Sequence, residues 1–205
     1  AYLDNATGLP NKNKCEEILN APDLLSAQDA VAICVFDLNN LRNINNNLGH
    51  DKGDEYIRSF AVQLRIAVAD EYFVGRDGGD EFIAVLKNVT RMQVEECLRD
   101  IREQAAKYSK EYPEMPISYA VGYAMSQDFE QSTMRELFRY ADKNMYIDKN
   151  RAKMEEAAEE KRMNQRLLAK VKEMGYQFSD CLYCDVFMDQ YRVLRASSKF
   201  FLAED

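Results

Sequence analysis

Residues 76–82 read RDGGDEF and lie between two segments, 71–75 and 82–86, with the aromatic and β-branched content of paired strands. Gly78 and Gly79 are expected to supply the positive φ of the turn between these strands. Asp80 and Glu81 follow directly, where their charges repel each other and lower the stability of the strand ladder. Because a divalent cation would offset this repulsion, the stretch predicts a catalytic turn that holds a metal.

A further carboxylate follows an apolar run of strand length, residues 31–36. Such a run is expected to form a central strand buried on both faces, and Asp37 ends it. A carboxylate here either caps the segment that follows or serves as a metal ligand. The next residues favour a ligand, because residues 41–48 have helical spacing, Gly49 ends that helix and Asp51 begins a longer one.

These two segments belong to a set of four motifs. Residues 4–12, DNATGLPNK, and residues 141–149, ADKNMYIDK, complete the set with the signature turn (76–82) and the segment 37–54. In their order and residues the four motifs resemble the GGDEF family of diguanylate cyclases, over roughly residues 1–153. The resemblance implies a nucleotidyltransferase of bacterial second-messenger signalling, which joins two GTP molecules into cyclic di-GMP and releases two pyrophosphates.

The apolar periodicity predicts an α+β fold with helices packed on one face of a mixed sheet. Helices are expected at about 11–25, 90–110 and 133–153, with a short helix at 41–48 and a longer one that starts at Asp51 and includes Leu64. Strands are expected at 31–37, at the two flanks of the signature turn and at 117–124. The resemblance implies a palm-like domain over residues 1–153, with a central mixed, mainly antiparallel sheet flanked by helices, related to nucleotide cyclases and polymerases. The residues expected to face inward are Tyr56, Ile57, Phe60, Leu64, Val94, Leu98, Ile101, Leu137, Phe138, Ala141 and Met145.

Composition limits the class of protein. The 205 residues are 46% hydrophobic and 30% charged, which suits one core-forming domain with an appendage. The net charge of −8 argues against a nucleic-acid binder. No apolar run has membrane-spanning length and no signal peptide is evident, so we expect a cytoplasmic stretch without membrane contact, within a full-length protein that can still be membrane-anchored. The five cysteines favour reduced thiols over disulfides.

The family resemblance implies metal ligands and a base. Asp37, Asp80 and the backbone carbonyl of Leu38 are the implied ligands of two Mg²⁺ or Mn²⁺ ions per active site, since hard cations take oxygen ligands. Two such ions polarise the α-phosphate of GTP and lower the pKa of the attacking ribose 3′-hydroxyl. Glu81, next to Asp80, is the implied general base. The alternative for Glu81 is an ordinary glutamate on a strand face.

The resemblance also implies contacts to the nucleotide. Asn45 and Asp54 match the family's guanine-binding pair and offer the amide and the acceptor that the guanine edge requires. Their alternative roles are a surface asparagine and an acidic residue in a first helical turn. The implied phosphate contacts are Lys149, Lys153 one helical turn later, Arg42, and the exposed backbone amides of residues 39 to 41, which include Asn40 and Leu41.

Several positions depart from the family pattern. Asn39 and Leu41 stand where the family often has Asp and Phe, and Lys153 stands in place of an Arg, which removes a bidentate phosphate contact. Many members have an inhibitory Arg-x-x-Asp motif before the signature turn, whereas residues 69–72 here read ADEY. We therefore expect no inhibitory site, unless Arg65, one helical turn before Ala69, replaces its arginine.

Residues 154–205 carry a different pattern. A charged helix is expected to continue to Glu173, followed by a hairpin with strands at 181–188 and 191–195. This arrangement resembles the opening of a PAS-like sensor domain; alternatively, the hairpin packs on the catalytic domain or on a second copy. Cys181 and Cys184 have the spacing of a zinc or redox pair, but they lack a second pair and fall within a strand pattern.

Two functions from different classes remain. One is an active cyclase that works as a homodimer, because the 3′-hydroxyl of each bound GTP must face the α-phosphate of the other. The other is a catalytically weak module that binds GTP or a cyclic dinucleotide and regulates an adjoining domain. The retained set of carboxylates and amides favours the cyclase, because keeping these charges together is costly without a ligand.

Overall fold

A computed structural model of the chain describes residues 2–173, which alternate between helices and strands. The strands are β1 (Leu25–Ser26), β2 (Ala32–Leu38), β3 (Phe73–Arg76), β4 (Glu81–Leu86), β5 (Tyr119–Met125) and β6 (Gln131–Ser132). The helices are α1 (Lys12–Leu19), α2 (Leu41–Leu48), α3 (His50–Ala67), α4 (Arg91–Glu111) and α5 (Met134–Glu173), with short 3₁₀ turns at Ala27–Asp29 and Ser126–Asp128.

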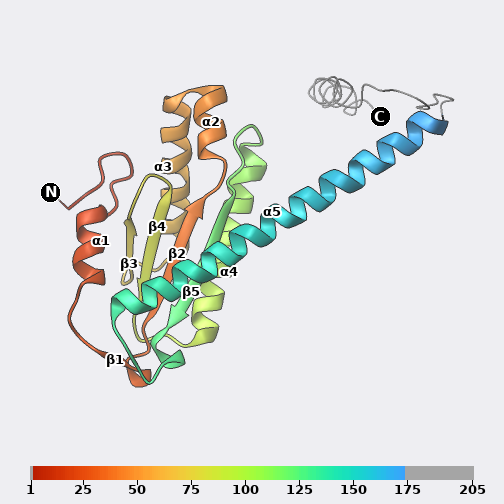
Figure 1. The fold of residues 1–205 in the computed structure, drawn as a ribbon. Helices are drawn as coiled ribbons and strands as arrows, with labels where there is room; N and C mark the ends of the chain where they lie inside the picture. The colour runs from red at the N-terminus through yellow and green to blue at the C-terminus, as the bar shows by residue number, and fades with distance from the viewer. Residues whose placement is uncertain (1, 174–205) are drawn as a thin grey trace. The chain divides into compact units, whose positions relative to one another are not determined.

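The central sheet has four strands in the order β3-β4-β2-β5, and each of its pairings is antiparallel (Figure 1). The expected hairpin around the signature turn is confirmed, since β3 pairs with β4 and Arg76 lies opposite Phe82. Strand β2 lies between β4 and β5, so Asp37 has Glu81 on one side and Ala120 on the other. The α+β class predicted from the sequence is confirmed.

Helices cover both faces of the sheet, so the expectation of helices on one face was wrong. One apolar core joins α3 and α4 to alternate residues of β2 such as Cys34 and Phe36. The other core joins α1 and α5 to the residues between them, Ile33 and Val35. The reason lies in β2 itself, because every one of its side chains is buried and a strand with two apolar faces needs cover on both.

The helices face the core largely as their periodicity predicts. Tyr56, Phe60 and Leu64 of α3 are buried, and so are the predicted inward residues of α4 and α5 except two. Leu98 and Phe138 are only partly buried and pack at the edges of the two cores. A 3.6-residue period thus identified the buried faces, although it did not say which side of the sheet each helix occupies.

Helix α1 is shorter than expected and ends at Leu19, with Asn20 as its C-cap. Pro22 explains the early end, because the residue before a proline is disfavoured in helical conformation. The following residues instead form β1, which pairs with β6 in a small second sheet that periodicity did not reveal.

By its internal packing the chain divides into two units, Ala1–Glu155 and Glu156–Asp205. Helix α5 extends to Glu173 as predicted, and residues 156–170 are mainly exposed. No helix within residues 2–173 is both long and apolar enough to cross a membrane. The predicted hairpin, with Cys181 and Cys184, lies outside the described residues.

Candidate functional site

The signature turn connects β3 to β4 through residues 77–80. The amide of Asp77 donates to the Glu81 carbonyl at 2.9 Å and closes the turn. Neither Gly78 nor Gly79 has a positive φ, so the expected reason for these glycines was wrong. A Cβ on Gly78 would instead lie 3.1 Å from Oε2 of Glu81, whereas a Cβ on Gly79 would meet open space. Glycine at 78 therefore leaves room for the Glu81 carboxylate.

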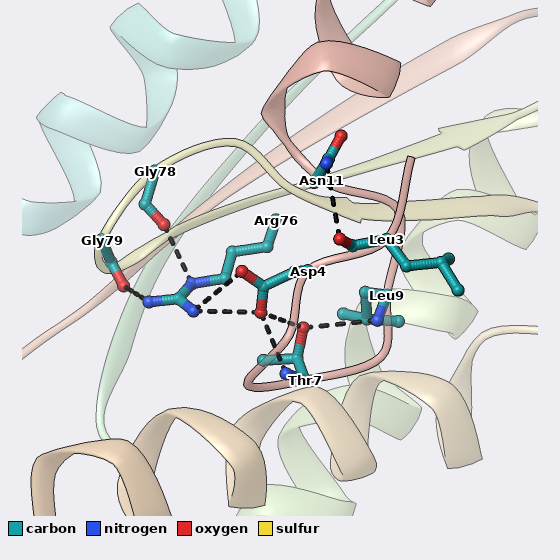
Figure 2. Close-up of polar contacts among 8 residues, drawn as sticks. All are labelled: Leu3, Asp4, Thr7, Leu9, Asn11, Arg76, Gly78 and Gly79. Carbon is teal, nitrogen blue, oxygen red and sulfur yellow. Dashed lines mark hydrogen bonds and ion pairs between the residues drawn. The ribbon is translucent and has the colours of Figure 1, made fainter. Parts of the chain in front are cut away.

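The guanidinium of Arg76 holds the turn from inside (Figure 2). Its Nε and Nη2 donate to the carbonyls of Gly78 and Gly79 at 3.0 and 2.7 Å, and its Nη1 forms an ion pair with Asp4 at 3.0 Å. Thr7 donates to Asp4 through both its amide and its hydroxyl. Burial raises the pKa of Asp4, but the hydrogen bonds from Thr7 and Arg76 outweigh it and leave the pKa below its usual value. The N-terminal motif thus fixes the shape of the signature turn.

The predicted metal ligands converge at one end of β2. Asp37 is 7% exposed and lies opposite Glu81 in the β2–β4 ladder. The amide of Leu38 donates to the Asp80 carbonyl at 2.9 Å, which extends the ladder by one bond and holds these two residues together. Residues 42 to 44 positions apart in the chain are therefore brought together by strand register.

Negative charge is concentrated at this place. Burial raises the pKa of Glu81 above its usual value, and the neighbouring carboxylates Asp80, Asp37, Asp77 and Asp142 raise it further. Within residues 2–173, no three His, Cys, Asp or Glu side chains are grouped closely enough to hold a metal by themselves. The donors that are present are all oxygens, which suits Mg²⁺ or Mn²⁺ bound together with phosphate oxygens.

Lys149 of α5 reaches this cluster. Its Nζ forms an ion pair with Oδ1 of Asp37 at 2.6 Å, across 112 positions of sequence. The predicted phosphate contact thus lies beside a predicted metal ligand and offsets its charge. Lys153 lies one turn later on α5 and is exposed.

The start of α2 follows directly after the carboxylates. Asn40 is its N-cap with φ of +66°, a conformation that asparagine tolerates, and its side chain makes no capping hydrogen bond. The amide of Asn39, which we expected to be exposed for phosphate, instead donates to the Ser118 carbonyl at 2.9 Å. The predicted phosphate contacts in this part of the chain are therefore Asn40, Leu41 and Arg42, of which Arg42 is exposed.

The predicted guanine ligands lie where α2 contacts α3. Gly53 is buried, and a Cβ there would overlap the carboxamide oxygen of Asn45. Gly53 therefore allows the Asn45 side chain to lie directly on α3. Asp54 is the next residue of α3 and is exposed to solvent. Both predicted residues thus stand at one helix contact, with Asp54 open to a ligand.

Sequence reasoning missed three contributions to this site. It gave no role to the ion pair of Arg76 with Asp4, although both residues lie in motifs that it identified. It also missed the ion pair between Lys149 and Asp37, because only the packing of α5 on the sheet brings them together. Finally, Asp77 is buried to 9% exposure and its Oδ1 has no hydrogen-bond partner. No sequence signal marks that burial.

We predict that Asp77→Asn stabilises the domain in a pH-dependent way. Burial raises the pKa of Asp77, with a further contribution from Glu16. A carboxyl with a raised pKa contributes stability below its unfolded pKa of about 3.9 and loses it as the pH rises through the folded pKa. The variant should therefore be more stable by about 1–3 kcal/mol at pH 7 and gain much less near pH 3.5.

Urea unfolding at the two pH values measures this difference, with the exposed Asp70→Asn as the matched control. An equal gain at both pH values would show that the charge of Asp77 is not the cause.

The match to a known family agrees with this geometry. The model of the family described as diguanylate cyclase, GGDEF domain, matches residues 1–155, and the chain belongs to this family of cyclic di-GMP signalling.

Relatives and solved structures show the same likeness. The chain is 28% identical over 155 residues to an uncharacterized membrane protein of Staphylococcus saprophyticus, which covers 72% of this chain and 43% of the relative. It is 26% identical over 168 residues to the cyclic di-GMP phosphodiesterase PdeR of Escherichia coli, covering 82% of this chain and 25% of that protein. The chain therefore spans less than half the length of these relatives.

Among solved structures, the GGDEF domain of DgcB from Caulobacter crescentus, in complex with c-di-GMP, superposes with a TM-score of 0.61 at 21% identity. The match covers 73% of this chain and 91% of that one, and supports the shared fold.

Proposed function

We propose that this domain is a diguanylate cyclase, which condenses two GTP into cyclic di-GMP and releases two pyrophosphates. The observation that carries the proposal is the register of β2 with β4. It sets Asp37 opposite Glu81 and beside Asp80, with the Lys149 ammonium on Asp37. Carboxylates next to a cation at the end of a central strand suit a metal-bound triphosphate.

The donor set fits the metal that the family implies. Asp37, Asp80 and the Leu38 carbonyl would hold Mg²⁺ or Mn²⁺, two ions per active site, since all are oxygen donors and the carboxylates crowd one another. When bound, such ions supply charge that polarises the α-phosphate and lowers the pKa of the attacking 3′-hydroxyl. Neutralising the cluster would also lower the raised pKa of Glu81 and favour its role as general base.

The remaining residues bind the nucleotide. Lys149, Lys153 and Arg42 offset the charge of the phosphates, and the amides at the start of α2 donate to phosphate oxygens. Asn45 and Asp54 select guanine, with the carboxylate of Asp54 accepting from its N1 and N2 hydrogens. Each domain holds one GTP, so the partner for turnover is a second copy of the domain, as a homodimer.

The proposed function also suggests a cellular compartment and a boundary for this domain. GTP and Mg²⁺ are available in the cytoplasm, so we assign the domain there. A relative is described as a membrane protein, and a membrane anchor elsewhere in the full-length protein is compatible with this assignment. We place the end of the GGDEF domain near residue 153 and assign residues 154–205 to a helical linker and a hairpin of the kind that opens a PAS-like sensor domain.

A non-catalytic role is the second candidate. It is favoured by the ion pair that Lys149 makes with Asp37, because this pair occupies one oxygen of a proposed metal ligand. A domain of this kind would bind GTP or a cyclic dinucleotide and regulate an adjoining domain without turnover.

Incubation with GTP and Mg²⁺, followed by chromatography, separates the two candidates. We expect cyclic di-GMP to form, and its formation to stop when EDTA removes the metal. GTP binding by calorimetry without any product, at protein concentrations that allow dimers, would instead identify the regulatory module.

We predict that cyclic di-GMP does not inhibit this domain through the surface that the family uses for feedback. That surface needs an arginine fork and a carboxylate, but the corresponding residues here are Ala69 and Tyr72, which carry neither group. Both line a cavity of about 170 Å³. The initial rate should stay nearly unchanged when product is added in excess over the enzyme.

Arg65 lines the same cavity and carries a guanidinium. Non-competitive inhibition that disappears in Arg65→Ala would show that Arg65 has rebuilt the inhibitory site.

A further inference from the structure

Strand β5 forms an edge of the central sheet, so one side of its backbone pairs with no strand within residues 2–173. Two backbone groups on this side are satisfied by side chains of α5 instead. The amide of Val121 donates to Oδ2 of Asp148 at 3.1 Å, and Nδ2 of Asn144 donates to the Tyr123 carbonyl at 2.9 Å. Asn144 and Asp148 are four residues apart and therefore lie on the same face of the helix.

Between these two hydrogen bonds, α5 rests directly on the strand. A Cβ on Gly122 would overlap the amide nitrogen of Met145 and the carbonyl oxygen of Ala141. The helix backbone thus touches the strand backbone at Gly122, and the two hydrogen bonds flank this contact on the adjacent strand residues. Three consecutive contacts fix both the rotation of α5 about its axis and its position along β5.

This attachment lies beside the candidate site. Lys149 follows Asp148 directly, and its Nζ reaches Oδ1 of Asp37 at 2.6 Å. In the β2–β5 register, Asp37 pairs with Ala120 and Phe36 pairs with Val121. The hydrogen bond of Asp148 is therefore made one residue from the strand position that faces Asp37. A small rotation of α5 at Asp148 would move Lys149 away from Asp37.

We propose that Asp148, supported by Asn144, is a positioning residue that sets the reach of Lys149 toward Asp37 and hence toward the triphosphate of GTP. The proposal rests on the function proposed above. Asp148 acts through its hydrogen bond with Val121 and not through its charge. Its other oxygen, Oδ1, accepts from Arg151, whose side chain is 70% exposed, and exposed ion pairs contribute little.

The test is a double-mutant cycle on steady-state kinetics with GTP. Asp148→Ala should raise KM for GTP about tenfold with little change in kcat, since it removes one hydrogen bond and loosens one phosphate contact. Asp148→Asn keeps an acceptor for the Val121 amide and should stay within about twofold of wild type. On a Lys149→Ala background, Asp148→Ala should add no further loss, because it acts through Lys149. Glu155→Ala, an exposed acidic residue of the same helix, is the matched control.

A second measurement does not depend on turnover. Hydrogen exchange of the Val121 amide, observed by NMR without nucleotide, should become faster in Asp148→Ala and remain slow in Asp148→Asn. Unchanged exchange of the Val121 amide in Asp148→Ala overturns the proposal. So does a double variant whose KM rises by the product of the two single-variant effects, because Asp148 and Lys149 would then act independently. Equal damage from the alanine and asparagine variants also overturns it, because the charge would then be the cause.

The proposed function fails in a different way. Suppose that the wild-type domain neither binds nor cyclises GTP, while exchange of the Val121 amide still responds to the Asp148 variants as expected. This result overturns the proposed function and with it the role of Asp148 toward GTP. A wild-type domain that cyclises GTP but shows independent effects overturns the positioning role alone.

Discussion

Asp80→Ala is expected to abolish the formation of cyclic di-GMP while leaving the fold intact. In the proposed function this residue contributes an oxygen ligand beside Asp37. Loss of the charge stabilisation that a metal provides in the transition state, about 4 kcal/mol, corresponds to a rate lower by about 1000-fold. Stability should be unchanged or slightly higher, because Asp80 is one of the carboxylates that raise the pKa of Glu81.

The product assay and a thermal unfolding curve measure the two effects on the same samples. Asp80→Asn keeps the shape of the side chain and separates charge from packing, and Asp100→Ala on the exposed face of α4 is the control. Turnover close to wild type in Asp80→Ala would refute the assignment of the metal site.

The combined variant Asn45→Ala and Asp54→Ala should lose its preference for GTP over ATP. An unmatched guanine edge loses hydrogen bonds worth about 1–3 kcal/mol each, so the preference should fall by roughly 10–100-fold for each residue. Competition binding of GTP and ATP measures this directly. An unchanged preference would place the guanine site elsewhere.

Gly53→Ala provides a sharper probe of the same proposed guanine site. The added methyl group would displace the Asn45 carboxamide without removing any polar group. We expect the guanine preference to fall about tenfold, while the helix is otherwise favoured by alanine over glycine. A loss of selectivity without a loss of stability would show that the position of Asn45 matters for guanine recognition.

Much of the fold was predictable because its patterns are local. The apolar run of β2 predicted a strand buried on both faces, and the periodicity of α3 and α5 identified their inward residues. The same patterns could not say which side of the sheet each helix covers, because order along the chain does not determine it. The early end of α1 could have been predicted from Pro22. The pairing of β1 with β6 could not, because it depends on residues about 105 positions later in the chain.

The candidate site was predictable where motifs carry it and not where packing creates it. The carboxylates, amides and lysines came from the motifs, and strand register brings Asp37, Asp80 and Glu81 together. The ion pair of Lys149 with Asp37 spans 112 positions and required the placement of α5. The expected positive φ of Gly78 was wrong because hairpin rules treat the turn alone, whereas here the guanidinium of Arg76 shapes it from inside.

The bond between Asp4 and Arg76 also sets a rule for building chimeras from this domain. A junction placed before Asp4 keeps the counter-charge of Arg76, whose guanidinium donates to Gly78 and Gly79. A junction after Thr7 would leave Arg76 with two carbonyls and no carboxylate, although every residue of the signature turn would still be present. The smallest portable unit of this turn is therefore discontinuous, made of two short segments more than sixty positions apart in the chain.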